Sequence, residues 1–203
     1  MYRLLLSAVV SFLTFSPIGC GRSASPPAPR LEISIPSDAS EDVRRALDVF
    51  NSAAPLDRAR ALSSLRESPM ARAQATSCCV TALQDANYLV RARAAELLGE
   101  SGDTSAMDPL VEMLEERAEH DRVRSAVAEA LGRLKAREAT QPLIAMLKDM
   151  VWNVRYQAAV ALGRIGDPAA TEALREAATY EANALVRDAV EKSLLQCSGA
   201  LHK

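Results

Sequence analysis

This chain has little of what a catalytic site needs. Of its 203 residues only two are histidines, His120 and His202, and neither has a metal-ligand spacing or belongs to a recognisable Ser/His/Asp set. No glycine-rich stretch joins a strand pattern to a helix pattern, which excludes a phosphate-binding loop. Aromatic residues make up 4% of the chain, which argues against a single large aromatic core. We therefore expect no catalytic residue, no metal and no cofactor.

The chain also lacks an excess of basic residues. It has 24 Lys and Arg against 26 Asp and Glu, whereas a nucleic-acid surface normally shows as a clustered basic excess. We expect no nucleic-acid partner. Cysteine is scarce too: Cys78 and Cys79 are adjacent and point in different directions from a helix, and Cys197 is distant, so no disulfide is expected. Cys79 is predicted to be a core residue, since buried free cysteine packs as a small hydrophobe.

The first twenty residues have the pattern of a secretory signal. One positive charge precedes an apolar run over residues 4–15, which is shorter than the ~18 residues that would cross a bilayer. Gly19 before Cys20 resembles the end of a bacterial lipoprotein signal, which implies that Cys20 is acylated and becomes the first residue of the mature protein. Pro17 departs from that pattern. The alternative is ordinary secretion, as a secreted or periplasmic soluble protein, with cleavage near residues 23–25.

The residues that follow Cys20 indicate how the protein would be held. Gly21 rather than Asp after the cysteine resembles an outer-membrane address in a Gram-negative cell, and two acyl chains would hold the protein stably. Residues 21–40 are rich in Ser, Pro and Ala, which predicts a flexible, partly extended tether of roughly 65 Å. The predicted organisation is a signal peptide over 1–20, a tether over 21–40 and a folded array over 41–203.

A repeat with a period near 32 residues runs through the remainder of the chain. Its skeleton is Val-Arg, then a small or branched residue at +4, Leu at +8 and, in three copies, Gly at +9. These positions fall on one side of a 3.6-residue helix, and a second helix follows each of the first three copies, with Leu twelve residues after the first Leu. A fixed period of this length is typical of stacked supersecondary units. The copies start at Val90, Val123, Val154 and Val186, with a degenerate copy at Asp57.

Glycine recurs at one position in the last turn of the Val-Arg helices. Glycine in a helix costs ~1 kcal/mol relative to alanine. Its retention in three copies predicts that neighbouring helices approach too closely for a Cβ atom. These glycines are Gly99, Gly132 and Gly163.

The proline-bearing helix, the polar turn and the Val-Arg helix together resemble HEAT repeats, in the compact form named after phycobilisome lyases. The resemblance covers residues 41–203 and implies an all-α solenoid of about five antiparallel helix pairs. Iron-dependent hydroxylases built from this repeat use His-Glu pairs, which this chain lacks. Repeat arrays present extended surfaces and need no catalytic group. The expected function is a non-catalytic protein-binding or assembly scaffold in the bacterial cell envelope; the alternative is an enzyme or lyase-type subunit that acts on a protein partner.

The arginine of each repeat is best interpreted as structural. In HEAT repeats this arginine typically pairs with an acid in the turn, and Asp85, Asp149 and Glu181 each lie five residues before a valine of the pattern. A bidentate guanidinium can satisfy carboxylates and carbonyls of neighbouring turns. Ala118 stands at that position in the third repeat, so the ladder is expected to be interrupted there. The ladder arginines are Arg58, Arg91, Arg124, Arg155 and Arg187.

A second apolar row marks a candidate partner-binding surface. Trp152, Tyr156 and Val160 are spaced i, i+4, i+8 and lie roughly opposite the core row of the same helix. Apolar and aromatic groups inside a polar rim are typical of a partner site. The alternative is that packing between repeats buries these three residues. The predicted rim consists of Glu96, Glu129, Arg133 and Arg164.

Overall fold

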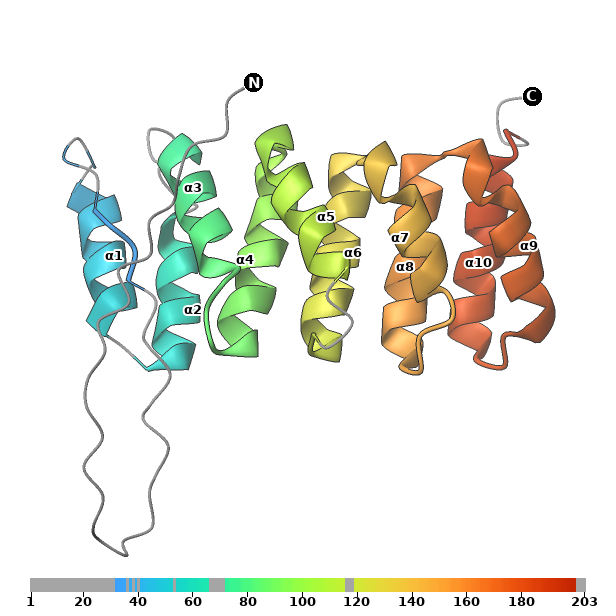
Figure 1. Cartoon of the computed structure of the whole chain (residues 1–203), viewed down its shortest axis with the longest axis horizontal. Helices are drawn as coiled ribbons and strands as arrows, with labels where there is room; N and C mark the ends of the chain where they lie inside the picture. The colour runs from blue at the N-terminus through green and yellow to red at the C-terminus, as the bar shows by residue number, and fades with distance from the viewer. Residues whose placement is uncertain are drawn as a thin grey trace, which may run out of the picture.

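The computed structural model describes residues 32–35, 37, 39, 41–52, 54–65, 72–115 and 119–199. In this part of the chain the regular structure is entirely helical, as predicted (Figure 1). None of the described helices is long and apolar enough to cross a membrane. The predicted signal peptide, Cys20 and most of the predicted tether lie outside the described residues.

The described helices pack as five consecutive pairs (Figure 1). The first helix of each pair lies in one layer and the second helix lies in the other layer. The first layer consists of α1 Glu41–Ser52, α3 Arg72–Ala82, α5 Met107–Glu115, α7 Thr140–Met146 and α9 Thr171–Tyr180. The Val-Arg layer consists of α2 Pro55–Ser64, α4 Tyr88–Ser101, α6 Asp121–Leu134, α8 Trp152–Ile165 and α10 Ala184–Cys197. Short 3-10 turns lead into α5, α7 and α9; they span Thr104–Ala106, Arg137–Ala139 and Pro168–Ala170.

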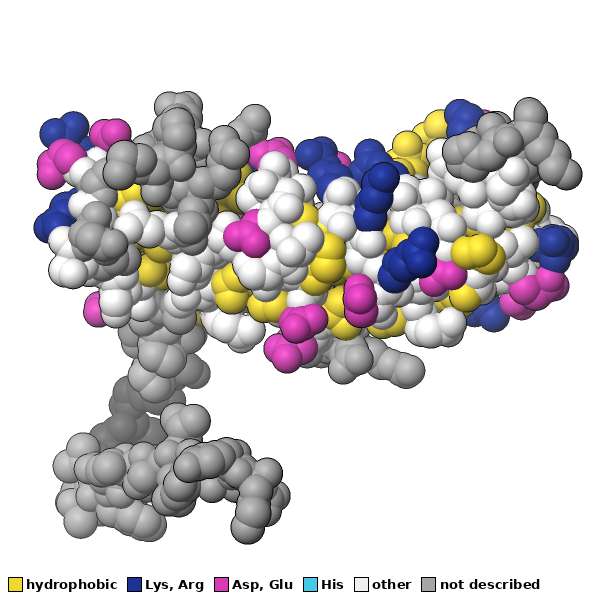
Figure 2. Space-filling model, turned by 90° about the horizontal axis from the view of Figure 1, so that it is seen from above, with side chains coloured by type: hydrophobic (Ala, Val, Ile, Leu, Met, Phe, Trp, Pro, Cys, Tyr) yellow, Lys and Arg dark blue, Asp and Glu magenta, His cyan; other side chains and the backbone are white. Residues whose placement is uncertain are grey.

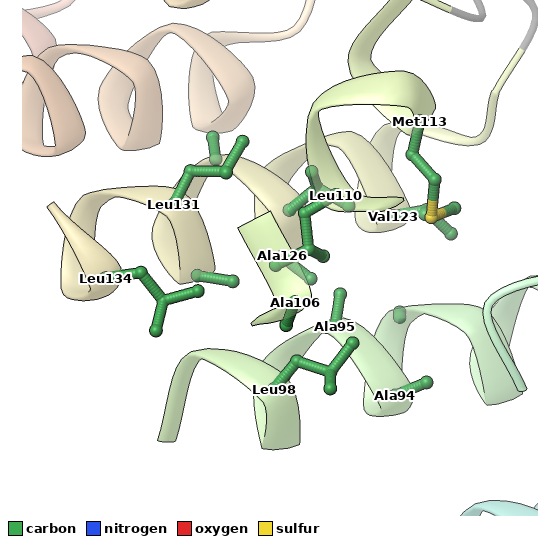
Figure 3. Packing of buried hydrophobic residues seen from close by; sticks show 14 of the residues in the cluster. Ala94, Ala95, Leu98, Ala106, Leu110, Met113, Val123, Ala126, Leu131 and Leu134 are labelled. Carbon is green, nitrogen blue, oxygen red and sulfur yellow. The ribbon is translucent and has the colours of Figure 1, made fainter. Parts of the chain in front are cut away.

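The core lies between the two layers and follows the predicted stripe. Leu98 from α4, Leu110 from α5 and Leu131 from α6 are fully buried and belong to one continuous hydrophobic core (Figure 3). Equivalent leucines, Leu143 and Leu162, are fully buried in the next repeat. The periodicity of the sequence therefore predicted the register of the core correctly.

The repeated glycines lie where neighbouring Val-Arg helices touch. A Cβ atom on Gly99 would lie 2.6 Å from the Cα of Ala130, and one on Gly132 would lie 2.6 Å from the Cα of Ala161. These neighbours are backbone atoms, so they cannot rotate away. The structure confirms the predicted close approach at Gly99 and Gly132, whereas a Cβ atom on Gly163 would meet side-chain atoms of Gln196 and Ser193.

The amino-terminal end of the described chain packs onto α1. The inner side of α1, which includes Leu47 and Phe50, is buried. Ile33 is 5% exposed, and its backbone N–H and C=O each form a 3.0 Å hydrogen bond with the side-chain amide of Asn51. Because this amide satisfies both backbone groups, residues 32–35 are held on the array. The carboxyl end of the predicted tether is thus part of the folded unit, a contact that composition alone does not reveal.

Candidate binding surface on the Val-Arg helices

The repeated arginines form a ladder of ion pairs between the turns of adjacent repeats. The Nη2 of Arg58 lies 2.7 Å from Oδ1 of Asp85, and the Nε of Arg155 lies 2.7 Å from Oε2 of Glu181. Arg124 reaches Asp149 in the same way, with Nε to Oδ2 at 2.9 Å. Each carboxylate accepts from both Nε and Nη2 of its arginine, which is the bidentate arrangement that gives strong, oriented pairs.

The ladder side chains also form hydrogen bonds with backbone groups of the turns. The Nη1 of Arg155 donates to the carbonyl of Asp149 at 2.8 Å, so this arginine joins its own turn to the next one. The carboxylate of Glu181 accepts the N–H of Asn183 at 2.8 Å, besides the guanidinium of Arg155. These hydrogen bonds lower the pKa of Glu181, the bond from Arg155 contributing most, although burial opposes ionisation. The paired arginines therefore act within the scaffold and have no binding edge left for a ligand.

The expected interruption of the ladder in the third repeat is wrong. Arg91 pairs with Glu119, with Nη2 to Oε1 at 2.5 Å and Nε to Oε2 at 2.8 Å. Glu119 is one residue closer to the repeat's valine than the other acids. A carboxylate one residue from the expected position is therefore enough to form the ion pair. Ala118 itself lies outside the described residues. Burial opposes the ionisation of Glu119, but hydrogen bonds from Arg91 and from the N–H of His120 outweigh it and lower its pKa.

Among the described residues, the cysteines are buried and the one histidine already makes structural contacts. Cys78, Cys79 and Cys197 are buried free thiols, and burial raises the pKa of Cys79 to about 12, which keeps it protonated and unreactive at neutral pH. His120 accepts the N–H of Arg122 at the start of α6 and its ring stacks on Tyr88, with ring centroids 3.8 Å apart. Among the described residues no three His, Cys, Asp or Glu side chains gather as a metal site would require. His202 lies outside the described residues.

The three residues of the predicted apolar row differ in how exposed they are to solvent. Tyr156 and Val160 are half-buried and pack against the hydrophobic core. Trp152, at the first position of α8, is 46% exposed. Only Trp152 of the three thus presents a large apolar area to solvent.

Further exposed apolar side chains lie around the turns next to Trp152. Met150 in the turn before α8 is 98% exposed, Leu185 at the start of α10 is 62% exposed, and Tyr180 at the end of α9 is also exposed. The ion pair between Arg155 and Glu181 joins the two turns, which lie at the same edge of the array (Figure 1). We call Met150, Trp152, Tyr180 and Leu185 the apolar turn patch.

Sequence reasoning missed most of this patch, although it carries a signal. Met150 directly follows a ladder acid, where the neighbouring repeats have Ala86, His120 and Ala182. A large apolar residue at a turn position that is otherwise small or polar could have been noticed. Its exposure, however, depends on how the two turns are placed together.

The predicted rim residues do not surround Trp152. Glu96 and Glu129 line a polar groove of about 380 Å³ that extends over α4, α6 and α8, together with Asn153 and Gln157. Each is paired within its own helix: Glu96 with Arg93 and Glu129 with Arg133, both at 2.8 Å.

Arg133 and Arg164 line a different hollow, of about 840 Å³, near the carboxyl ends of α6, α8 and α10. Trp152 and Arg164 lie twelve residues apart on α8, which corresponds to roughly 18 Å along a helix axis. The four residues therefore fall into two separate hollows. In Figure 2, which looks onto the edge where α8 and α10 end, basic side chains are visible on this part of the surface.

A partly open pocket of about 250 Å³, with both apolar and polar walls, lies between α2, α3 and α4. Its apolar walls include Leu62, Ala75 and Leu97, and its polar groups include Thr76 and Ser101. Cys79 also lines it, but its protonated thiol supplies no nucleophile there.

The two layers of antiparallel helix pairs form an α-solenoid, and ion pairs between arginine and Asp or Glu link its adjacent repeats. The chain belongs to the HEAT-repeat family, whose pattern, described as HEAT repeats, matches residues 43–122 and 114–195. A comparison with curated proteins finds no match.

Solved structures show the same fold. The chain is similar to "the complex of CpcE and CpcF of phycocyanin lyase from Nostoc sp. PCC7120", with 24% identity and a TM-score of 0.60 over 74% of this chain and 96% of that chain. It also matches human deoxyhypusine hydroxylase in complex with glycerol, with 18% identity and a TM-score of 0.38 over 78% of this chain and 97% of that chain. The first similarity confirms the predicted short solenoid; the second is too weak to carry an argument.

Proposed function

We propose that this protein is a non-catalytic binding or assembly scaffold that recognises a protein partner in a bacterial cell envelope. The observation that carries the proposal is the apolar turn patch. It holds four of the eight large hydrophobic side chains that are exposed in the described part of the chain, within two adjacent turns. Clustered exposed apolar groups mark interaction sites more often than isolated ones do.

The composition of the patch suits protein recognition. Tryptophan and tyrosine are enriched among the residues that contribute most to binding. Methionine adapts its shape to irregular surfaces, and Met150 is almost fully accessible. The ion pair of Lys148 with Glu176, at 3.3 Å, lies beside Tyr180 and supplies a charged border. The patch thus has an apolar centre and a polar edge, the usual arrangement of a partner site.

The test compares capture of the partner by matched variants of the full chain. Trp152→Ala and Leu185→Ala should each reduce capture at least about tenfold, as expected for residues at the centre of an interface. Leu56→Ala is the control, because Leu56 is exposed to a similar degree on α2, at the other end of the array. All three variants should keep the melting temperature of the wild type. Equal capture by all four proteins would contradict the proposal.

We further propose that the chain is held at a membrane by lipid on Cys20. The support is the sequence of the first twenty residues, in which an apolar run ends at Gly19-Cys20. The expected result is partition of the protein into detergent and a mass that includes lipid. Cys20→Ser should release a soluble form or block processing. A mature protein that begins downstream of Cys20 and carries no lipid would contradict the proposal and favour the secreted or periplasmic alternative.

The second candidate function is a lyase-type subunit that acts on a protein partner. Its support is the shared fold with the complex of CpcE and CpcF of phycocyanin lyase, which is also an assembly of two proteins. If this function is correct, mixing the protein and its partner with a bilin should give a covalently coloured acceptor protein. A colourless acceptor together with intact partner capture would favour the scaffold.

A further inference from the structure

The last arginine of the ladder differs from the other four. Arg58, Arg91, Arg124 and Arg155 have side chains 11–19% exposed, and each binds the carboxylate of the following repeat. Arg187 is exposed, and no ion pair of this kind joins it to any described residue, since the described chain has no sixth turn.

Arg187 nevertheless keeps the contact that orients the paired arginines. Its Nη1 donates to the carbonyl of Glu181 at 3.1 Å, as the Nη1 of Arg155 donates to Asp149 and that of Arg91 to Asp85. In the paired copies this contact leaves Nε and Nη2 directed at the next turn. The equivalent edge of Arg187 is therefore preset to accept a carboxylate at the end of the array.

A second copy of this chain stacked in register on α10 would not supply that carboxylate. In the first repeat the position of the ladder acids is occupied by Ser52, the last residue of α1, so a stacked copy would present no acid there. The outer side of α10 also departs from the internal pattern: Leu195 stands at the position of the repeated glycine and is exposed, and Glu191 stands where α8 has the buried Ala159. Helix α10 therefore cannot receive another copy as closely as α6 receives α8.

We infer that Arg187 docks an aspartate or glutamate from a turn of a different protein, bound bidentately through Nε and Nη2. This inference rests on the proposed protein-binding function and names the chemistry of the partner. Leu185 of the apolar turn patch lies in the same first turn of α10, so the charged contact and the apolar contacts belong to one end of the array. The partner's acid takes the place that Glu181 has opposite Arg155.

The experiment uses the full chain with a photo-crosslinking residue in place of Ala184, next to Arg187. The crosslinked partner peptide is sequenced, and capture is measured for Arg187→Glu, Arg187→Lys and Arg175→Glu. Arg175→Glu is the matched control, because Arg175 lies on α9 at the same end of the array and, among the described residues, forms its ion pair within its own helix, with Glu172. Arg187→Glu should weaken capture at least about tenfold, and Arg187→Lys should weaken it less, because lysine keeps the charge without the bidentate fork.

The decisive measurement is binding between variants in which the charges of Arg187 and of the partner's acid are exchanged. An arginine in place of the partner's crosslinked acid should restore binding to Arg187→Glu while weakening binding to the wild type. Four results overturn the inference: a crosslinked segment without Asp or Glu, a crosslink to a second copy of this chain, equal losses for Arg187→Glu and Arg175→Glu, or no rescue by charge exchange. If Trp152→Ala loses capture while Arg187→Glu retains it, the inference fails and the proposed function stands. If the wild type captures nothing, both fail.

Discussion

The junction between α6 and α8 and the junction between α2 and α4 are built from the same repeat but pack differently. At the first, Gly132 lies against the backbone of Ala161. At the second, Leu97 stands at the position that Ala161 has in its repeat, and α2 has only 10 residues against 14 in α4, α6, α8 and α10. The pocket of about 250 Å³ lies at this junction.

The comparison shows which residues set the spacing between repeats. Both junctions have buried leucines on the inner side, including Leu62 at one and Leu131 at the other. The leucine stripe therefore fixes the register of the helices, whereas the pairing of glycine with alanine fixes how closely they approach. Where that pairing is lost, the helices pack less closely and a pocket remains between them.

The largest effect is expected from the close junction. Leu131→Ala should reduce the free energy of unfolding by ~2–5 kcal/mol, because Leu131 of α6 is fully buried in the hydrophobic core and its truncation leaves a cavity in a rigid surrounding. Urea denaturation followed by circular dichroism measures the loss. A change below about 0.5 kcal/mol, the scale of surface substitutions, would contradict the assigned register.

The ladder predicts a second, smaller effect with a pH dependence. Arg155→Met should cost ~1.5–3 kcal/mol at neutral pH, because it leaves the buried carboxylate of Glu181 without its charged donor. The pKa of Glu181 is lowered in the folded state, so its stabilising contribution is complete above its ordinary pKa of 4.5 and is lost as the pH falls below that value.

Acid titration of stability tests this assignment. The wild type should lose more stability than Arg155→Met as the pH falls below about 4.5, since the variant lacks the interaction that favours ionised Glu181. Arg187→Met serves as the control and should change stability by less than about 0.5 kcal/mol at any pH, because Arg187 is exposed and has no carboxylate partner among the described residues. Parallel pH profiles for the wild type and Arg155→Met would contradict the prediction.

Gly132→Ala tests the close approach directly. In an open helix this change would gain ~1 kcal/mol from helix propensity. Here the new Cβ would lie 2.6 Å from the Cα of Ala161, so the helices must separate, and we expect a loss of ~1–3 kcal/mol. The sign of the change in melting temperature decides between the two effects.

The smallest effect is expected at the loose junction, and its sign is opposite. Ala75 lines the pocket between α2, α3 and α4, so Ala75→Leu can fill part of it and should gain ~0.5–1 kcal/mol. Ala161→Leu is the matched substitution at the close junction and should destabilise the protein, because Ala161 already touches Gly132. A loss for both variants would mean that the two junctions are equally well packed.

The features that could be predicted from the sequence are those that recur along it. The core register follows from the leucine stripe, the close helix contacts from Gly99 and Gly132, and the roles of the arginines from the resemblance to HEAT repeats. The wrong expectation at the third repeat came from requiring an acid at one fixed position, whereas the side chain of Glu119 reaches Arg91 from the next residue.

The features that could not be predicted depend on particular neighbours. The exposure of Met150 and Leu185 depends on how two turns meet, and no periodicity describes that meeting. Ile33 packs onto α1 through Asn51, 18 residues away, although its surroundings have the composition of a linker. Arg164 lies away from Trp152 because the two are at opposite ends of α8, and Arg133 lies near the carboxyl end of α6; a helical-face argument ignores this position along the helix. The fold therefore does not bring all residues of the predicted partner-binding surface together.

The arginine ladder also affects how far local unfolding of one repeat spreads to its neighbours. Because the turn at Asp149 both receives Arg124 and supplies a carbonyl to Arg155, loss of that one turn weakens the contacts on its two sides. Stacked repeats usually behave as units coupled only to their neighbours, and shared turns strengthen that coupling. Backbone amides in α6 and α8 should therefore exchange with solvent deuterium in a common event, while those of α1 and α2, beyond the pocket, should exchange earlier and independently.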